Sequence, residues 1–421
     1  MSRSNPIHTF ISQLLRAVLS AVFVILCSRW LGAEGRGELG LVLFWAGLLM
    51  MGNDFVGGSN LANAMQRFSL SALFPFSLAW SAFMLLTGFV LLMLFGGDSK
   101  MAWMVGLVSL PMVLLSIQYN VQQGLALVKQ RNRLQLLLEL LKLLLLVSFV
   151  SSWDSIDLGV GTAIASLFYA LLLVLAVSTW LLRKPLFSAL ATAEKPPKVL
   201  FTDGFWSQIG HLAQFLGYRL SLYSLTYWLG TAAAAGVYAN ALLIADTIWI
   251  FANSFGTIAH VRILRSKNAV FQADITLRYA LIAVVGTTLA CLFLAILPST
   301  LFVAVFGHGF EALKDTALLL IPAIVSVSAA SLFSHYLHAV NRFKLLFLAN
   351  VAGLLLQTLL GVYLIPRWGI YGACVAADFG FFLVLLVVYR QFKLSNPNAR
   401  LHGVVRIKGM LKILKQLVKL A

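Results

Sequence analysis

Long apolar runs, separated by short polar segments, recur along the whole sequence. A helix needs about 20 apolar residues to cross a hydrocarbon core of about 30 Å. Runs of this kind lie near 9–28, 38–58, 73–96, 101–122, 134–151, 158–182, 204–229, 235–259, 277–297, 316–339, 343–365 and 370–391. The pattern therefore predicts an all-α polytopic membrane protein with about 12 transmembrane helices.

The order of the runs divides the chain into two halves. We expect a six-helix bundle over residues 1–182, a cytoplasmic linker over 183–203, a second six-helix bundle over 204–391 and a tail over 392–421. None of the connections is long enough to fold a soluble domain. Any ligand must therefore bind within the bundles or at their ends, and we expect a central cavity.

The composition excludes several classes of protein. Of the 421 residues, 61% are hydrophobic and 11% are charged, whereas a soluble domain carries about 25% charged residues. The three cysteines, Cys27, Cys291 and Cys374, lie in apolar runs without metal-ligand spacing. The sequence holds no phosphate-binding loop, HExxH motif or nucleophile elbow. We therefore expect neither an enzyme nor a metal site or bound cofactor.

The basic residues indicate how the chain is oriented. Lys and Arg number 31 against 14 Asp and Glu. If the N-terminus is cytoplasmic, most of these basic residues fall in cytoplasmic segments, as the positive-inside rule requires. The rule predicts that both termini are cytoplasmic.

The tail has a pattern of its own. Lys408, Lys412, Lys415 and Lys419 recur every three or four residues, and apolar residues fill the other side. This pattern predicts a basic amphipathic helix that lies on anionic cytoplasmic lipid. A partner-docking helix is the alternative. Nucleic-acid binding is not expected, because no aromatic stacking residues accompany the charges.

Two short segments occur in both halves. Trp30-Leu31-Gly32 ends the first span, and Trp228-Leu229-Gly230 ends the seventh. Residues 130–134 (QRNRL) compare with residues 341–345 (NRFKL), and each segment opens a long apolar helix. Because each half has an even number of spans, the halves would be parallel repeats. Internal symmetry of this kind is typical of transporters.

These segments resemble a known family. Residues 28–39 (SRWLGAEGRGEL) resemble the first-loop signature of the polysaccharide-repeat flippases, which belong to the multidrug/oligosaccharidyl-lipid/polysaccharide (MOP) exporter superfamily. Tyr218-Arg219, followed by residues 228–239, is similar to the central segment of that family, and residues 365–373 (IPRWGIYGA) resemble its last turn. One feature departs from the family pattern. The family often has an Asp shortly after the central arginine, but Leu220 and Ser221 follow Arg219 here.

The resemblance implies a function, a location and partners. It implies a flippase that moves polyprenyl-diphosphate-linked oligosaccharide repeat units from the cytoplasmic to the outer face of the bacterial inner membrane. The product would be O-antigen, capsule or exopolysaccharide. A polysaccharide polymerase and chain-length machinery would be partners, and a proton or sodium gradient would drive the transport.

Polar residues within the spans indicate where a substrate would bind, because an ionisable side chain in a membrane usually has a functional role. Arg16 lies in span one and Arg219 in span seven, and arginine suits a diphosphate since it stays charged and binds phosphate bidentately. We therefore predict that Arg16 and Arg219 bind the diphosphate. The polar residues expected to line the cavity with them are Ser12, Gln13, Asn53, Gln208, His211 and Gln214.

Alternatives remain open at this point. Arg16 can instead extend to the inner face, and Arg219 can pair with Asp246 or Asp54. Glu139 and Lys142, three residues apart, are expected to pair with each other. The candidates for ion coupling are Asp54, Asp246, His335 and His338. The alternative function is a cation-coupled multidrug antiporter of the same superfamily, although two arginines disfavour a cationic substrate.

Overall fold

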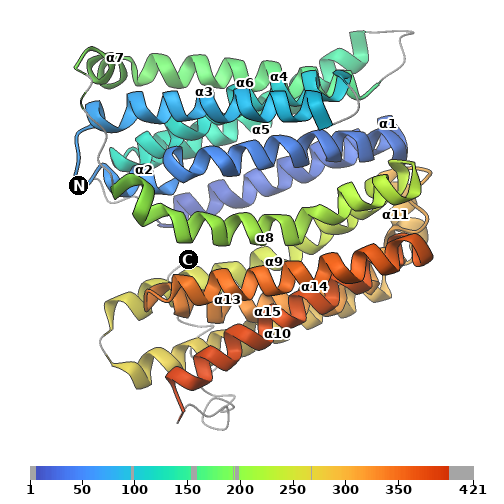
Figure 1. The fold of residues 1–421 in the computed structure, drawn as a ribbon. Helices are drawn as coiled ribbons and strands as arrows, with labels where there is room; N and C mark the ends of the chain where they lie inside the picture. Colours follow the sequence, from blue (N-terminus) through green and yellow to red (C-terminus); the bar gives the residue numbers. More distant parts are fainter. Residues whose placement is uncertain are drawn as a thin grey trace. The chain divides into compact units, whose positions relative to one another are not determined.

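The computed structural model describes residues 6–95, 99–152, 159–192, 194, 199–266 and 268–397, and within them it contains helices and no strand (Figure 1). The predicted basic helix at 408–419 lies outside the described residues. Nine helices of the described part are long and apolar enough to cross a membrane, or ten if the bent pair α12 and α13 forms one span. The protein is thus an all-α, multi-pass membrane protein, as the sequence predicts.

Two compact units divide the chain, unit 1 over Met1–Leu212 and unit 2 over Ala213–Ala421. The division falls within α8 (Val199–Leu229), the helix in which the sequence places the start of the second bundle at residue 204. The other helices of unit 1 are α1 (Pro6–Gly57), α2 (Ser59–Ala64), α3 (Leu70–Phe95), α4 (Ser99–Gly124), α5 (Val128–Ser152), α6 (Val160–Leu181) and α7 (Arg183–Ala191).

Helix α1 accounts for two of the predicted spans. Its 52 residues would extend about 78 Å at 1.5 Å per residue, far more than one membrane crossing needs. Gly32 interrupts it with a φ of 66° and a ψ of −174°, outside the helical region. Glycine adopts this left-handed φ without steric cost, and so the Trp-Leu-Gly segment separates spans one and two.

Unit 2 continues with α9 (Ala233–Arg265), α10 (Ala269–Ile296), α11 (Ser299–Phe306), α12 (Leu313–Leu319), α13 (Ile321–Ala339), α14 (Phe343–Trp368) and α15 (Ile370–Ser395). The run at 316–339, predicted as one span, is two helices bent by 46°. Asp378 of α15 accepts a hydrogen bond from the backbone N–H of Ala323 at 2.8 Å, close to this bend. The short helices α7 and α11 lie in segments where the sequence predicted only connections.

The repeat is visible in the backbone. Gly230, which ends α8, has the same φ of 66° as Gly32. The turns before α5 and α14 also match, because Ala126 and Asn341 have φ values of 59° and 58°. In both turns the next residue donates its N–H to the carbonyl five residues earlier. The bond from Leu127 to Gln122 and the bond from Arg342 to Leu337 are each 2.8 Å long. The comparison of 130–134 with 341–345 was therefore wrong in register by four residues, and the matching residues are Ala126 and Asn341.

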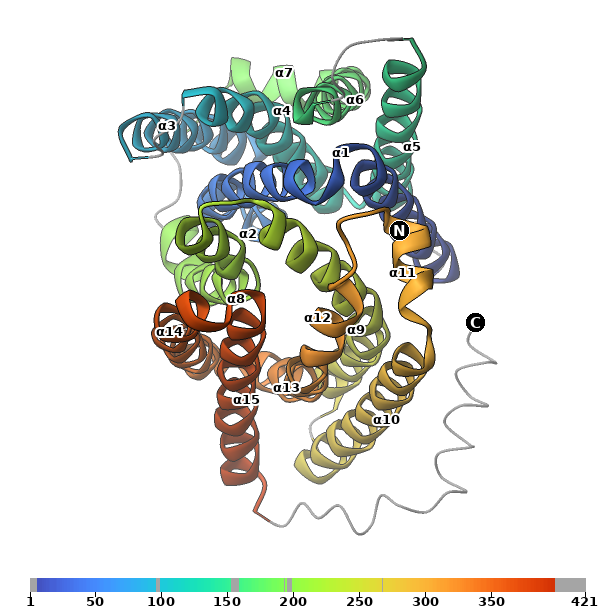
Figure 2. The ribbon, with the colours of Figure 1, turned by 90° about the vertical axis from the view of Figure 1, so that its right-hand side faces the viewer.

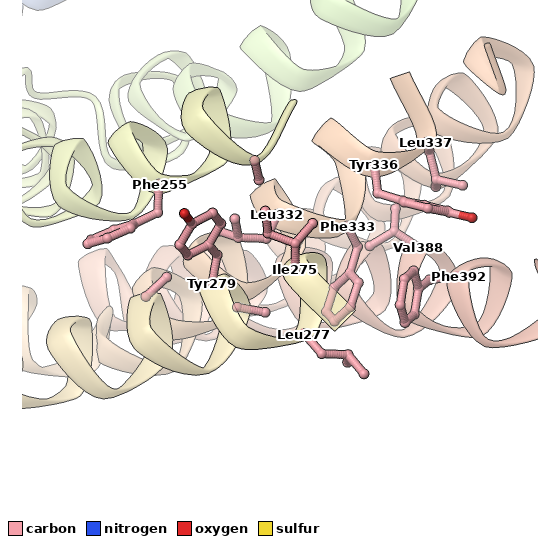
Figure 3. Close-up of a cluster of buried hydrophobic side chains, with 14 of the residues drawn as sticks. Phe255, Ile275, Leu277, Tyr279, Leu332, Phe333, Tyr336, Leu337, Val388 and Phe392 are labelled. Carbon is pink, nitrogen blue, oxygen red and sulfur yellow. The ribbon is translucent and has the colours of Figure 1, made fainter. Parts of the chain in front are cut away.

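The core of unit 2 forms where α9, α10, α13 and α15 meet. Helices α9, α10 and α13 pack against one another in pairs (Figure 2). The buried cluster contains small and aliphatic side chains together with the rings of Phe255, Tyr279, Phe333, Tyr336 and Phe392 (Figure 3). Ring contacts join α9 to α10 and α13 to α15.

Helices α14 and α15 approach closely at two glycines. A Cβ atom on Gly353 would lie 2.8 Å from the carbonyl oxygen of Gly380 and 2.4 Å from Val384 Cγ2. We expect Gly353→Ala to destabilise the protein by about 1–3 kcal/mol, because overpacking forces the helices apart. The measurement is the thermal unfolding midpoint of the purified protein. Gly161→Ala in α6 is the matched control, since a Cβ there meets no atom within 4 Å. An unchanged midpoint for Gly353→Ala would contradict the close approach.

Candidate functional site

Arg16 lies where three helices of unit 1 pack together. Helix α1 contacts both α4 and α5, and α4 contacts α5. The half-buried Arg16 donates a hydrogen bond from Nη1 to Oε1 of Gln135 on α5, at 2.5 Å. Its Nε is buried and has no hydrogen-bond partner among the described residues, and no described carboxylate forms an ion pair with it. Arg16 therefore keeps both its charge and a spare donor.

Arg219 is in a different state. Its Nη2 lies 3.0 Å from Oδ2 of Asp246 on α9, which makes an ion pair within unit 2. Asp246 is one of the two partners that the sequence left open. Beside this pair, Tyr218 packs against the rings of Trp249 and Phe381. The carboxylate of Asp246 neutralises the guanidinium of Arg219. Arg219 is therefore less able than Arg16 to bind an anionic ligand.

The residues predicted to line the cavity fall in both units. Ser12, Gln13, Asn53, Gln208 and His211 belong to unit 1, and Gln214 belongs to unit 2. Ser12, Asn53 and Gln208 are buried, whereas Gln13 and His211 are exposed and Gln214 is half-buried. Their role in binding a substrate stays a prediction.

The candidate coupling groups have distinct surroundings. Asp54 Oδ1 lies 3.4 Å from both Ser116 Oγ and Asn53 Nδ2, and Ser81 donates to Asn53 at 2.6 Å. This is a polar network inside unit 1. Asp246, by contrast, forms the ion pair with Arg219.

The two candidate histidines lie on α13. His335 Nε2 is 3.4 Å from Asn253 Oδ1, and its carbonyl oxygen is 3.0 Å from His260 Nδ1. The ring of His338 packs edge-on against Phe343. Among the described residues, no group of three or more His, Cys, Asp or Glu side chains could hold a metal ion.

Sequence reasoning missed a polar stripe on α5. Arg131, Gln135 and Glu139 follow one another at steps of four residues and thus share one face of the helix. Glu139 forms the expected pair with Lys142, at 2.5 Å. The four-residue spacing of these polar residues is visible in the sequence and could have indicated the stripe.

Solved structures of similar architecture identify the fold. An inward-facing multidrug resistance MATE family transporter of the MOP superfamily matches with a TM-score of 0.73 at 13% identity, over 91% of this chain and 96% of that one. The lipid II flippase MurJ matches with a TM-score of 0.68 at 12% identity, over 92% and 87% of the two chains. This chain has the MOP transporter fold. The fold, built of two six-helix repeats, explains the paired Trp-Leu-Gly turns.

A third solved structure with the MOP fold bears on the charge of the binding pocket. A MOP superfamily transporter from Pyrococcus furiosus, described as having a binding pocket of reverse polarity that suggests a different function, matches with a TM-score of 0.64 at 12% identity. It covers 93% of this chain and 94% of its own. No protein-family model matches the sequence, and no curated protein matches it significantly.

Proposed function

We propose that this protein is a flippase that moves polyprenyl-diphosphate-linked oligosaccharide repeat units from the cytoplasmic to the outer face of a bacterial inner membrane. The observation that carries the proposal is the state of Arg16, which lies in a helix of a membrane bundle. Among the described residues, no carboxylate pairs with it and its buried Nε has no hydrogen-bond partner. A guanidinium in such a place is costly unless it serves a ligand. The MOP fold is shared with a lipid II flippase and is therefore compatible with a lipid-linked substrate.

The chemistry of Arg16 suits a diphosphate. Arginine remains protonated at any physiological pH, and its N–H groups match two phosphate oxygens in parallel. In a low-dielectric bundle such charge-assisted hydrogen bonds are stronger than in water. Nearby amide and hydroxyl side chains, including Gln13 and Ser12, can bind sugar hydroxyls. The substrate thus combines an anion, a glycan and an apolar tail.

The multidrug antiporter is the competing function. Solved structures with the MOP fold include MATE transporters as well as a flippase, so the fold does not choose between them. The charge favours the flippase, because an unpaired arginine repels a cationic drug. We place both termini in the cytoplasm, and a polysaccharide polymerase and chain-length machinery would act on the product.

The proposal is tested by deleting the gene in its host and extracting the lipids. We expect a complete polyprenyl-diphosphate oligosaccharide repeat to accumulate on the cytoplasmic face, because the flippase no longer removes it. A membrane-impermeant glycan-modifying reagent reports the face, and plasmid-borne wild type should clear the intermediate. No accumulation, together with unchanged surface polysaccharide, would refute the proposal and favour the multidrug antiporter.

A further inference from the structure

A second arginine of unit 1, Arg131, lies one helical turn before Gln135, the residue that binds Arg16. It is half-buried in the first turn of α5. Arg131 is within electrostatic range of Arg16 and of the hydroxyl of Tyr119 on α4. Its Nη1 donates a hydrogen bond to Oε1 of Gln123, which is also on α4. Helices α1, α4 and α5 therefore bring two cations together.

The nearby acid does not neutralise these two arginines. Glu139 is the acidic group of the same stripe, and its carboxylate is 2.5 Å from the ammonium of Lys142, so it balances that charge instead. Among the described residues, no carboxylate pairs with Arg16 or Arg131. Two like charges that are partly shielded from water repel each other. An anion bound between them would remove this repulsion.

The unused polar atoms of this cluster are suited to an anion. Four atoms, the Nε atoms of both arginines, Nε2 of Gln130 and the hydroxyl of Tyr119, are buried without a hydrogen-bond partner among the described residues. Oε2 of Glu139 on the same stripe is also buried without a hydrogen bond, but it lies 2.5 Å from the Lys142 ammonium. Three of the four can only donate, and the tyrosine hydroxyl can donate as well. Buried donors without acceptors are costly, so the cluster has the composition of a phosphate site rather than a cation site.

Comparison of the two repeats shows that the arginines of this cluster occur in unit 1 and not at the matching positions of unit 2. The matching turns at Ala126 and Asn341 place Leu346 of α14 where Arg131 stands in α5. Leu346 is buried in the apolar core of unit 2. The matching Gly32 and Gly230 place Gln214 where Arg16 stands. Neither arginine therefore has a cationic counterpart at the matching position of the second repeat.

We propose that Arg131 is the second arginine of a diphosphate site formed within unit 1 by Arg16, Arg131, Gln130 and Tyr119. This inference rests on the proposed function, because it takes the diphosphate to be that of the lipid-linked substrate. Arg219, which is neutralised by Asp246, is not part of the site. The two guanidinium groups bind the two phosphoryl groups, while Gln135 and Gln123 orient the arginines from α5 and α4.

The test measures binding of farnesyl diphosphate and of inorganic pyrophosphate to the full-length protein in phosphatidylcholine nanodiscs. The variants are Arg131→Gln, Arg131→Lys and Arg16→Gln. Arg133→Gln is the matched control, because Arg133 is an exposed arginine on the same turn of α5. Monodisperse elution and an unchanged unfolding midpoint establish that each variant folds. Arg131→Lys keeps the charge and so provides a measurement even if Arg131→Gln fails to fold.

We expect Arg131→Gln and Arg16→Gln each to lower the affinity for both probes by roughly ten- to a hundredfold, because each variant loses charge-assisted hydrogen bonds to the diphosphate. Arg131→Lys should lie between wild type and Arg131→Gln, because lysine cannot bind bidentately. Arg133→Gln should remain within about twofold of wild type.

The possible results separate the inference from the proposed function. Wild-type affinity in Arg131→Gln, with weak binding in Arg16→Gln, would remove Arg131 from the site and leave the proposed function intact. Binding of pyrophosphate without binding of farnesyl diphosphate would overturn the lipid-linked source. If the gene deletion accumulates no lipid-linked oligosaccharide while binding still depends on Arg131, the site stands and the proposed function fails.

Discussion

Arg16→Ala is expected to reduce clearance of the lipid-linked oligosaccharide by roughly a hundredfold, since the substrate loses two charge-assisted hydrogen bonds. The residue donates to Gln135 and retains an unpartnered Nε, so the truncation removes a charge available to a ligand. The measurement is the amount of cytoplasmic-face intermediate in a deletion strain that carries the variant, at matched protein abundance in the membrane.

Two companion variants make this result specific. Arg133→Ala removes an exposed arginine of α5 and should clear the intermediate as wild type does. Arg16→Lys keeps the charge but not the bidentate geometry, so it should retain partial transport. Full transport by Arg16→Ala would show that Arg16 does not bind the substrate and would favour its extension to the inner face.

Asp246→Leu is expected to destabilise the protein by about 2–3 kcal/mol, the order of the cost of an unpaired arginine in a membrane span. Asp246 and Arg219 lie 3.0 Å apart, on α9 and α8. Removing both charges in Arg219→Leu/Asp246→Leu should recover most of the loss, because replacing a whole pair with apolar residues costs far less than breaking it. A double-mutant cycle on the unfolding midpoint in detergent measures the coupling.

A second ion pair of unit 2 is the matched control. Arg278 and Asp274 lie 2.9 Å apart on α10, and their side chains are 39% and 38% exposed, close to the 34% and 42% of Arg219 and Asp246. They are one helical turn apart on a single helix, so Asp274→Leu should cost less than about 1 kcal/mol. Equal losses for Asp246→Leu and Arg219→Leu/Asp246→Leu would show that Asp246 does not compensate the charge of Arg219.

Part of the fold could be predicted from local pattern. The spans follow from runs of apolar residues, and the Trp-Leu-Gly segments predict turns because glycine alone adopts a φ of 66° without strain. The register of the second repeated segment could not be predicted in this way. The similarity of 130–134 to 341–345 concerned side chains, whereas the matching turn at Ala126 and Asn341 is defined by backbone hydrogen bonds.

The break between α12 and α13 likewise depends on more than the local sequence. The run at 316–339 is apolar enough for one span, and Pro322 is compatible with the first turn of a helix. What satisfies the backbone near the bend is Asp378, which comes from α15 and accepts the N–H of Ala323. A contact between helices so far apart in the sequence leaves no local signal.

By itself, the sequence determined that this is an all-helical membrane protein with repeated halves, because hydropathy and glycine turns act over a few residues. It also determined the pair of Glu139 and Lys142, which one helix turn brings together. Only the tertiary structure decided which arginine is neutralised by Asp246, and that Arg16 binds Gln135, one turn of α5 from Arg131. These relations depend on how each helix is rotated against its neighbours, and that rotation is set by packing across the whole unit.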